Sequence, residues 1–459
     1  MGRPTLPSQY VATRLDASRR DLLGLAGGWP RRYPMLLDSA AHGPLGRYCL
    51  LAVSPRRRLV LRRSAVVHDS RDGRRRGGFL DALEQQLRTT GMARAGGEWP
   101  FIGGWFVYLG YETVSEIEPR LNLPAAESPI TACAWQVDNA IVHDTSTGES
   151  WYLSVSGNQA ALATIEGDLE RLRRPQVSAF SCKVAMCEEA PDLYLRRVER
   201  AKELIAAGEI YQANLSRWWR GSLPVDAPIA ALYDQLCSDN PAPMAGLMFC
   251  ENMALLSSSP ERLLSIDRDR FIATRPIAGT RPRASGHAAE RTMIEQLREH
   301  PKERAEHIML IDLERNDLGR VCVPGSVEVN EYMNIETYAH VHHIVSNVRG
   351  RLREDVSPIA ALRATFPGGT ITGCPKFRCM QIIAELEGVG RGAYTGAIGY
   401  IGYDGRADFN ILIRSLVMVD RAIELRAGAG IVADSDPQSE LEETRAKARG
   451  VLKALGAAT

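Results

Sequence analysis

Pairs of short apolar segments, separated by turn residues and not by helices, restrict the folds open to this chain of 459 residues. Residues 33–39 (YPMLLDS) and 48–53 (YCLLAV) are such a pair, with a Gly-Pro-Leu-Gly turn between them. Other stretches place apolar side chains at helical spacing, as residues 191–207 do before Gly208. Because strand pairs and helices follow one another in mixed order, the pattern predicts an α+β sandwich and argues against a regular βαβ winding.

The first part of the chain is richer in strands than the rest. Further strands are expected there at 103–111, 130–143 and 151–155, and helices at 79–91 and 158–174. Residues 175–190 show no steady period and are the best candidate for a linker. Beyond them, helices are expected at 191–207, 226–238, 288–298, 301–313, 357–365, 375–387 and 438–455, and strands at 245–256, 262–267, 271–275, 327–331, 396–403, 408–418 and 421–427. We therefore predict a strand-rich N-terminal lobe at residues 1–175 and a second domain at residues 186–459.

Charge and cysteine content narrow the possible functions. Lys and Arg total 56 and Asp and Glu total 55, so no excess charge favours nucleic acid or an anionic membrane, and binding must come from a local site. The nine cysteines form no C-x-x-C pair, which argues against a zinc site and favours a reducing compartment. The first residues contain no basic segment followed by an apolar one, and no apolar run reaches the roughly 20 residues of a membrane span. We expect a cytoplasmic protein.

Two pairs of glutamates are the strongest chemical signal in the sequence. Glu303 and Glu306 are three residues apart in PKERAEHIMLIDL, and Glu440 and Glu443 have the same spacing in SELEETRAKA. On a helix, residues three apart share one face, so each pair can direct two carboxylates at one centre. Carboxylate oxygens suit Mg²⁺, which keeps further ligands from water and substrate. Two solvated helix faces with basic neighbours would also explain the spacing.

Two glycine-rich segments could approach an anionic ligand. FPGGTITGCPK, at 366–376, leads to a helix start near Pro375, where backbone N–H groups suit a carboxylate or a phosphate. RAGAGIVADS, at 426–435, lies ahead of the helix of Glu440. The first lacks the G-K-[ST] ending of a Walker A motif, and the second lacks the G-x-G-x-x-G of a dinucleotide site. A plain structural turn would explain the first equally well.

Arg414, in the strand-like ILIRS, and the pair His342 and His343, in HVHHIVSNV, are polar residues in apolar surroundings. A guanidinium buried without a partner is unfavourable, and a substrate carboxylate or an internal Asp or Glu would satisfy it. A histidine in an apolar run is more often a core residue than a catalyst. The chain has no G-x-S-x-G nucleophile motif.

Nine segments in one order resemble the chorismate-utilising enzymes, a family that includes anthranilate, aminodeoxychorismate, isochorismate and salicylate synthases. They are GEIYQANLS (208–216), SSPER (258–262), RPIAGTRPR (275–283), PKERAEHIMLIDLERNDLGRVC (301–322), HHIVSNV (342–348), GGTITGCPK (368–376), GAIGY (396–400), ILIRS (411–415) and AGAGIVADS with ELEETRAKA (427–448). LLDSAAHGPLGRY, nearer the N-terminus, is similar to the family's first lobe. The resemblance implies a large α+β sandwich of two sheets with helices on the outer faces, as in anthranilate synthase component I. It also implies an active site between the sheets, in a chorismate-binding catalytic domain at 186–459.

The resemblance implies a role for each candidate residue. Mg²⁺ would bridge to the ring carboxylate of chorismate and would be held by Glu303, Glu306, Glu440 and Glu443. The residues that bind the substrate would be Gln212, Thr280, Thr370, Tyr400 and Arg414, with the backbone of Gly428, Ala429 and Gly430. Tyr400 and Arg414 would hold the substrate's other carboxylate. Glu261 would protonate the departing hydroxyl, Lys447 would help to bind the substrate, and His343 would lie near the pyruvyl side chain.

One position favours ammonia over water as the nucleophile. Members of the family that form isochorismate or salicylate have a lysine base where this chain has Gln212, in YQANLS. A neutral amide cannot deprotonate water, so we expect ammonia to attack. The chain has no recognisable glutaminase motif, and the resemblance implies that a separate glutamine amidotransferase subunit supplies the ammonia.

Different segments of the sequence favour different products of the reaction. Ala278, in PIAGT, matches anthranilate synthases, whereas one group of aminodeoxychorismate synthases has a lysine there that attacks the ring. GGTITGCPK, SPER, VHHIVS and LLDSAAHGPLGRY look closer to aminodeoxychorismate synthase. We therefore predict a protein closest to aminodeoxychorismate synthase component I, which makes 4-amino-4-deoxychorismate for 4-aminobenzoate and folate synthesis. The alternatives are anthranilate synthase component I and a non-catalytic relative that binds chorismate or an aromatic amino acid.

Overall fold

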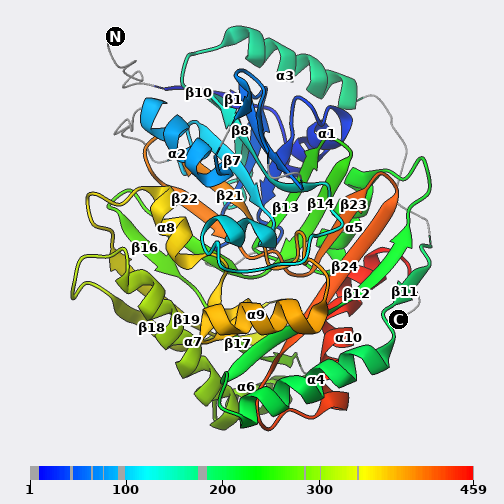
Figure 1. Ribbon diagram of the computed structural model, residues 1–459. Coiled ribbons are helices and arrows are strands. Elements are labelled where there is room, and N and C mark those ends of the chain that lie inside the picture. Colours follow the sequence, from blue (N-terminus) through cyan, green and yellow to red (C-terminus); the bar gives the residue numbers. More distant parts are fainter. Residues whose placement is uncertain are drawn as a thin grey trace.

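Two large antiparallel sheets stack on each other and carry helices on their outer sides (Figure 1). The computed structural model describes residues 10–41, 45–63, 66–75, 77–90, 99–173, 183–283, 286–299, 301–338 and 341–457. Within these residues each sheet has twelve strands. The predicted α+β sandwich of two sheets with outer helices is confirmed.

Each sheet combines strands from distant parts of the chain. In spatial order, the first sheet contains β1 (Val11–Leu15), β10 (Glu149–Ser154), β9 (Asn139–Asp144), β3 (Tyr48–Val53), β2 (Met35–Asp38), β13 (Met244–Cys250), β14 (Met253–Ser259), β23 (Ser415–Val419), β24 (Ala422–Ile431), β12 (Gln212–Ser222) and β11 (Met186–Glu188), with β20 (Gly373–Cys374) paired to β12. The second sheet contains β17 (Ile277–Pro282), β19 (Val341–Arg351), β16 (Phe271–Thr274), β15 (Arg262–Ile266), β22 (Ala407–Asn410), β21 (Ala397–Gly402), β7 (Gly104–Leu109), β8 (Ile130–Val137), β4 (Arg57–Arg62), β5 (Val67–Asp69) and β6 (Gly73–Arg75), with β18 (Glu328–Thr337) paired to β19.

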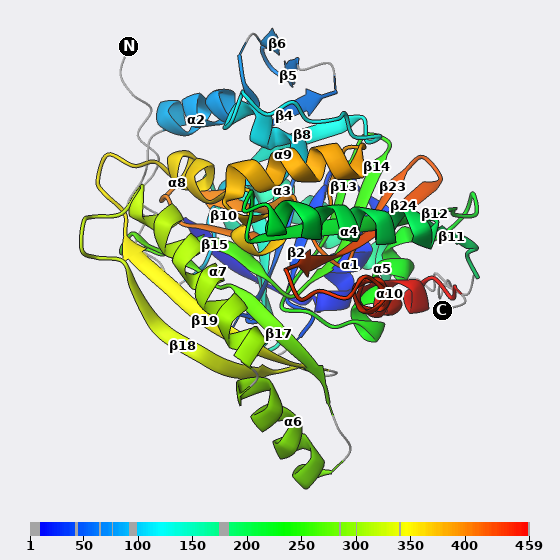
Figure 2. The ribbon, with the colours of Figure 1, turned by 60° about the horizontal axis from the view of Figure 1, so that its bottom comes forward.

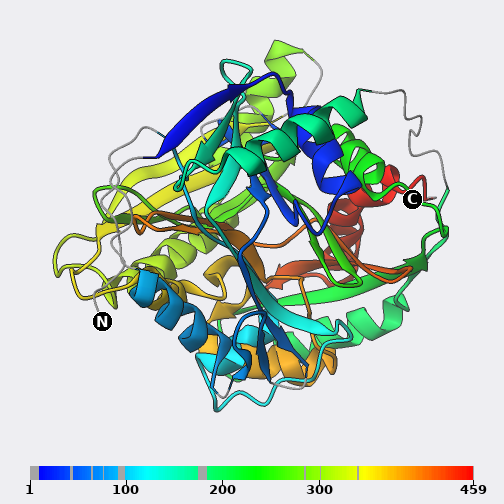
Figure 3. The ribbon, with the colours of Figure 1, turned by 90° about the horizontal axis from the view of Figure 1, so that it is seen from above.

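Helices cover the outer faces of both sheets, as the view from above shows (Figure 3). In the described part of the chain they are α1 (Arg19–Gly28), α2 (Phe79–Thr90), α3 (Gln159–Leu172), α4 (Pro191–Ala206), α5 (Ile229–Asp239), α6 (His287–Glu299), α7 (Pro301–Gly319), α8 (Pro358–Thr365), α9 (Lys376–Glu387) and α10 (Pro437–Ala454), with the 3-10 turns η1 (Tyr111–Glu116) and η2 (Gly369–Ile371). Apolar side chains of α1, α3, α5 and α10 pack on the first sheet, and those of α2, α7 and α8 pack on the second. Figure 2 shows α6 extending away from the rest of the molecule.

A third apolar cluster lies between the two sheets. In β7, Phe106 and Tyr108 belong to this cluster, whereas Trp105 and Val107 belong to the cluster under the outer helices. Successive side chains of a strand point to opposite faces, so a strand buried on both faces is apolar throughout. This explains why residues 103–111 show no alternation of polar and apolar residues.

Local signals define the helices that flank the candidate site. The Asp436 side chain accepts a hydrogen bond of 2.8 Å from the Ser439 N–H group and so caps α10, and Pro437 stands in its first turn. Helix α9 ends at Gly388, whose φ of 66° is the left-handed conformation that glycine adopts without strain. The cap fixes the first residue of α10 and therefore the position of Glu440 and Glu443 along the helix.

The predicted division into a lobe at 1–175 and a domain at 186–459 does not separate the sheets. Strands β13 and β14 from the second part pair within the same sheet as β2 and β3 from the first part. As a statement about independent folding units, the division stays a prediction. Of the proposed linker, residues 175–182 lie outside the described residues, and Met186–Glu188 form β11.

Some elements differ from the sequence prediction. Residues 408–418, expected as one strand, form β22 in the second sheet and β23 in the first, with a crossing between them. The patterns also missed α1, β12 and β19. β12 is buried along most of its length and so lacks the alternation by which half-buried strands are recognised.

The expectations about membrane spans and about cysteines can be compared with the described residues. None of the helices in this part of the chain has both the length and the apolar composition of a membrane span. The eight cysteines that the structure describes all have free thiols.

Candidate functional site

Two of the points at which the chain crosses between the two sheets are neighbours, and each of these two crossings carries a candidate residue. β14 of the first sheet leads through Glu261 into β15 of the second, and β22 of the second sheet leads through Arg414 into β23 of the first. The crossings are bonded to each other, because Ile411 N–H donates to the Glu261 carbonyl at 3.0 Å and Ser258 N–H donates to the Arg414 carbonyl at 3.2 Å. The φ of Arg414 is 50°, a conformation that residues with a Cβ rarely adopt and that clusters at functional sites.

Glu261 is a buried carboxyl group that can keep its proton near neutral pH. Burial raises its pKa to about 7. The Thr370 hydroxyl and the Ile277 N–H group lower this pKa, and so do the positive charges of Lys447 and Arg414. A carboxyl group that titrates near neutrality is suited to general acid catalysis.

His343, on β19, lies within the electrostatic reach of the same two cations. Burial lowers its pKa to about 3, and the charges of Arg414 and Lys447 act in the same direction. A hydrogen bond with the backbone of Gly279 opposes the change but does not cancel it. His343 is therefore a neutral imidazole, and Glu261, Arg414, Lys447 and His343 form one group around the crossings.

Two glycines of β24 leave room for side chains that lie across its backbone. A Cβ on Gly428 would lie 2.6 Å from the Tyr394 hydroxyl and 2.6 Å from the Leu215 carbonyl oxygen, and a Cβ on Gly430 would overlap the amide of Gln212. Ala429, between them, points to the opposite face, where it joins an apolar cluster with residues of α4 and α10. The structure thus brings Gln212 to the glycines, while Ala429 contributes backbone and core packing.

Lys447 links this strand to helix α10. Its Nζ donates a hydrogen bond of 3.0 Å to the Gly428 carbonyl and lies 2.7 Å from the Glu443 carboxylate. Its side chain is 39% exposed, so it lies at the solvent side of the group. An ammonium in this position supplies positive charge close to Glu261 and to the bare backbone of β24.

Several buried polar atoms in this region lack hydrogen-bond partners among the described residues. They include Oε1 of Glu261, Oε1 of Gln212 and Oγ1 of Thr370. The Thr370 hydroxyl is near enough to Glu261 to lower its pKa but is not in hydrogen-bonding geometry. Because buried polar groups are normally paired in folded proteins, these atoms mark a surface suited to a polar ligand.

The structure does not bring Tyr400 to this group, contrary to the role expected for it. Its ring packs edge-on against Phe101, with centroids 5.3 Å apart, in the apolar cluster between the sheets. The charged groups that influence its pKa include Asp408 and Arg406, on and beside β22. Successive side chains of β21 point to opposite faces of the sheet, and this alternation decides which way the Tyr400 side chain points. A sequence motif alone does not reveal that direction.

Tyr394 occupies the place expected for Tyr400. Its hydroxyl lies against Gly428 and donates to Asn214 Oδ1 at 3.5 Å, and Glu261 is among the groups that influence its pKa. Sequence reasoning missed both Tyr394 and Asn214. The segment RGAYTGAIGY contains both tyrosines, so the available signal was a tyrosine a few residues earlier in the same motif.

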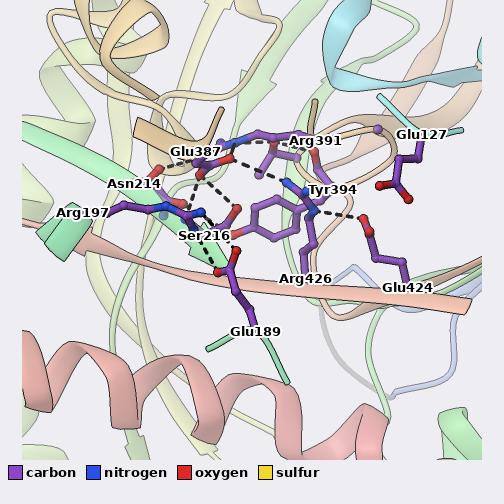
Figure 4. A network of polar contacts seen from close by, with 12 residues as sticks. Glu127, Glu189, Arg197, Asn214, Ser216, Glu387, Arg391, Tyr394, Glu424 and Arg426 are labelled. Carbon is purple, nitrogen blue, oxygen red and sulfur yellow. Dashed lines mark hydrogen bonds and ion pairs between the residues drawn. The ribbon is translucent and has the colours of Figure 1, made fainter. Parts of the chain in front are cut away.

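A buried ionic network fixes the backbone behind Tyr394 (Figure 4). Arg391 binds both oxygens of Glu387, at 2.6 and 3.0 Å, and also donates to the carbonyls of Asn214 and Ile371. Glu387 in turn accepts from the Ser216 N–H group at 2.8 Å. The network therefore ties β12, η2 and the end of α9 together.

The two glutamate pairs stand on the expected helices. Glu303 and Glu306 are half-buried on α7, and a Cβ on Gly279 would lie 2.8 Å from Glu303 Oε2, so this pair lies beside β17. Glu440 is buried on α10 and Glu443 is 49% exposed. Among the described residues, no three His, Cys, Asp or Glu side chains are close enough together to hold a metal ion. The donors are nevertheless all hard oxygens, and Mg²⁺ is usually held by one or two carboxylates with water and substrate, so each pair fits such an ion in kind and number.

Thr280 is the remaining expected substrate contact. Its backbone pairs with His343 across β17 and β19, next to the irregularity at Gly279. The Thr280 side chain lies outside what the structure describes, so its proposed contact stays a prediction.

Comparisons with known proteins identify one family and several relatives. The family model of chorismate binding enzymes matches residues 43–453. Anthranilate synthase component 1 of Synechocystis sp. is 38% identical over 464 residues, which cover 93% of this chain and 91% of that protein. Aminodeoxychorismate synthase component 1 of Bacillus subtilis is 36% identical over 440 residues, which cover 93% of this chain and 92% of that protein.

Solved structures repeat the same fold. Anthranilate synthase component I from Streptococcus pneumoniae has a TM-score of 0.80 and 29% sequence identity, and the match covers 90% of this chain and 93% of that one. The menaquinone-specific isochorismate synthase from Escherichia coli has a TM-score of 0.73 at 18% identity, with 98% and 94% covered, and is similar in fold.

Proposed function

Because the chain belongs to the family of chorismate binding enzymes, we propose that it replaces a ring hydroxyl of chorismate with an amino group from ammonia and releases 4-amino-4-deoxychorismate. Action on chorismate follows from the family. The identity of the nucleophile and of the product is what we propose beyond the family. The relatives do not decide it, because an anthranilate synthase and an aminodeoxychorismate synthase each match 93% of this chain. The proposed protein is an aminodeoxychorismate synthase component I.

The observation that carries the proposal is the group of Glu261, Arg414 and Lys447 around unsatisfied polar atoms. Chorismate is a dianion with a poor leaving group, the ring hydroxyl. Arg414 and Lys447 supply two positive charges, and Glu261 supplies a proton near neutral pH. Anion binding and protonation of the leaving group are therefore available at one place.

The residues divide the reaction as follows. Arg414 and the backbone of Gly428 to Gly430 would bind a carboxylate of the substrate, with the Tyr394 hydroxyl beside them. Glu261 would give its proton to the departing hydroxyl, which leaves as water. The neutral imidazole of His343 would donate a hydrogen bond to an oxygen of the side chain of chorismate without adding charge.

Magnesium is part of the proposal. The ion would be held by a glutamate pair, Glu303 with Glu306 or Glu440 with Glu443, whose oxygens suit it, with water and substrate as further ligands. When bound, it would neutralise the ring carboxylate and stabilise charge that develops on the ring.

Gln212 supports ammonia as the nucleophile. Its amide lies against Gly430, in the region of the unsatisfied polar atoms, and a neutral amide cannot deprotonate water. Ammonia attacks without prior deprotonation and loses a proton afterwards. A separate glutamine amidotransferase subunit would supply it, and the cytoplasm is the expected location.

A second candidate product is anthranilate. Ala278, buried on β17, cannot attack the ring as a lysine would, which leaves direct attack by ammonia as the common first step of both candidates. Anthranilate formation would need ammonia to attack the ring carbon next to the one that carries the carboxylate, with loss of the same hydroxyl, and then the elimination of pyruvate.

A product assay tests the proposal and separates the candidates. The protein is incubated with chorismate, Mg²⁺ and ammonium salt. Anthranilate is measured by its fluorescence, and 4-amino-4-deoxychorismate is measured as 4-aminobenzoate after a lyase is added. We expect 4-aminobenzoate that depends on the lyase. Fluorescence without the lyase identifies anthranilate synthase, and tight chorismate binding with no product under any nitrogen source identifies a non-catalytic binder.

A further inference from the structure

A second buried carboxyl group, Glu314, lies close to Glu261 and has no part in the mechanism above. It stands on α7, and its Oε1 is 3.2 Å from the position that a Cβ on Gly369 would take. Gly369 begins the η2 turn, and the next residue of the turn, Thr370, lies beside Glu261. Both carboxyl groups therefore lie against the same short turn.

The surroundings of Glu314 favour its neutral form. Burial and the neighbouring charges of Asp317 and Glu261 raise the pKa of Glu314 to about 7. Lys376, on α9, and the Thr274 hydroxyl, on β16, act in the opposite direction. Glu314 and Glu261 thus have similar proton affinities, so that a proton can pass between them at little energetic cost.

On the other side, Glu314 adjoins a route to solvent. Lys376 binds the carboxylate of Asp317, one helical turn beyond Glu314, and also donates to the carbonyl of Pro367 at 2.9 Å. Asp317 and Lys376 line a cavity of about 730 Å³ between α7, α8 and the start of α9. The order of groups is therefore cavity, Asp317 with Lys376, Glu314 and Glu261.

We propose that Glu314 returns a proton to Glu261 after each turnover and is itself recharged from the cavity through Asp317. This inference rests on the proposed amination. It makes Glu314 a relay residue that acts through Glu261 and does not touch the substrate.

The proton balance of the cycle requires that Glu261 be protonated again, and Glu314 is placed to do this. Glu261 loses its proton when the C–O bond breaks with its electron pair on oxygen and water leaves. The nitrogen of the attacking ammonia later releases one proton, so the cycle is neutral, but Glu261 remains a carboxylate in a buried place. Glu314 would transfer its proton to that carboxylate, directly or through the Thr274 hydroxyl or a water molecule, and take a new one from the cavity.

Rapid-mixing kinetics of Glu314→Gln test the relay. The glutamine keeps the size of the side chain but has no transferable acid proton. The rates are measured at several pH values, and the concentration of ammonium salt is adjusted so that the concentration of free ammonia stays constant. We expect the first turnover to keep its wild-type rate, because Glu261 starts protonated, while steady-state kcat falls about tenfold or more, which gives a burst of one product per site. The solvent deuterium isotope effect should rise on kcat and not on the first turnover.

Two variants make the result specific. Glu203→Gln, which changes an exposed carboxylate on α4 that does not line the cavity, should leave both rates unchanged. Thr274→Val, which removes the hydroxyl beside Glu314, should also slow later turnovers more than the first, and it serves as the test if Glu314→Gln does not fold. Equal slowing of the first and later turnovers, or no slowing at all, would overturn the relay.

A measurement without substrate separates this inference from the proposed function. Infrared absorption by protonated carboxyl groups is recorded for the free protein at about pH 6, below the pKa of both carboxyls. Glu314→Gln should remove one protonated carboxyl group, and an unchanged spectrum would overturn the relay even in an active enzyme. Failure of the wild-type protein to aminate chorismate, with the expected spectrum present, would instead overturn the proposed function.

Discussion

At the scale of single residues, the chemistry of Glu261 is produced by its surroundings. Its sequence neighbours, Pro260 and Arg262, give no reason for an unusual carboxyl group. Its position where the chain leaves one sheet for the other buries it against Thr370 and the second crossing. Burial then outweighs two nearby cations and keeps the proton in place.

Replacement of this carboxyl group tests its role as an acid. Glu261→Gln keeps the shape and the hydrogen-bonding capacity of the side chain but cannot donate an acid proton. We expect kcat for amination of chorismate to fall on the order of 10²-fold or more, with the affinity for chorismate little changed. Glu203→Gln, in an exposed pair with Arg200, is the matched control and should keep full activity. A kcat of the variant close to that of the wild type would rule out Glu261 as the acid.

The same residue makes stability depend on pH. The pKa of Glu261 rises from an ordinary 4.5 to about 7, so the folded chain binds this proton more tightly than the unfolded chain. The contribution to stability is fully present below pH 4.5 and is lost as the pH rises through 7, on the order of 3 kcal/mol in all. Denaturant unfolding of the wild type and of Glu261→Gln at pH 5 and pH 8 measures it. The difference between the two proteins should change with pH in this direction, and a constant difference would contradict the assigned pKa.

At the scale of elements, strand β24 and its partner β12 form the floor of the site. Gly428 and Gly430 point to one face and Ala427 and Ala429 to the other, because side chains alternate along a strand. Gln212 and Tyr394 use the space that the missing side chains leave. The network of Arg391 and Glu387 holds β12 and η2 in register behind this floor.

An added methyl group on β24 should disturb the floor but not the fold. In Gly430→Ala the new Cβ would meet the end of the Gln212 side chain, which can rotate away. We expect a higher KM for chorismate or a lower kcat, with the midpoint of thermal unfolding nearly unchanged. Gly167→Ala, on α3, meets no atom within 4 Å and should stabilise the helix by up to about 1 kcal/mol without affecting catalysis. Unchanged kinetics in Gly430→Ala would exclude this face of β24 from the site.

The ionic network should contribute to stability as well as to position. Arg391 and Glu387 have side chains that are each 2% exposed, so Arg391→Met leaves the buried Glu387 carboxylate with Arg426, at 3.7 Å, as its remaining cation. The hydrogen bonds from Ser216 also remain, but they bring no positive charge, and we expect the free energy of unfolding to fall by about 3 kcal/mol or more. Arg200→Met breaks an exposed pair with Glu203 and should cost less than about 1 kcal/mol. Equal effects of the two substitutions in denaturant titrations would show that the network has no special role.

At the scale of the whole molecule, the candidate site is assembled from both sheets and from helices at distant positions in the sequence. Glu261 and Arg414 come from the crossings, His343 from the second sheet, the glycines from the first, and the glutamate pairs from α7 and α10. Each sheet also contains N-terminal strands, so the site depends on the complete sandwich.

The proposed magnesium ion can be tested through both activity and stability. Exhaustive chelation should abolish amination, and added Mg²⁺ should restore it. In the presence of chorismate, Mg²⁺ should also raise the midpoint of thermal unfolding, because a ligand that binds the folded state stabilises it. Glu440→Gln, which removes the charge of the buried member of one pair, should reduce this shift. Full activity after chelation would exclude the metal.

Much of this arrangement could be read from the sequence. Helices and strands with clear periodicity were predicted near their observed positions, and the α+β class followed from their order. The motifs indicated the family and most of the site, since Glu261, Arg414, Lys447, His343 and Gln212 all lie in the same region. These features depend on the spacing of apolar residues and on short motifs, both of which are visible in the sequence.

The remaining features depend on directions and distances that no local pattern contains. Which tyrosine of RGAYTGAIGY faces the site is decided by the path of the chain before β21 and by the pairing of that strand, and the structure selects Tyr394 where the motif favoured Tyr400. The split of 408–418 between two sheets and the contact of Glu314 with the turn beside Glu261 arise in the same way. The sequence by itself determined the class of fold, the family and the inventory of reactive groups, because these follow from residue types and their spacing. Only the tertiary structure decided which of those groups are buried together, and burial sets their pKa values and therefore their chemistry.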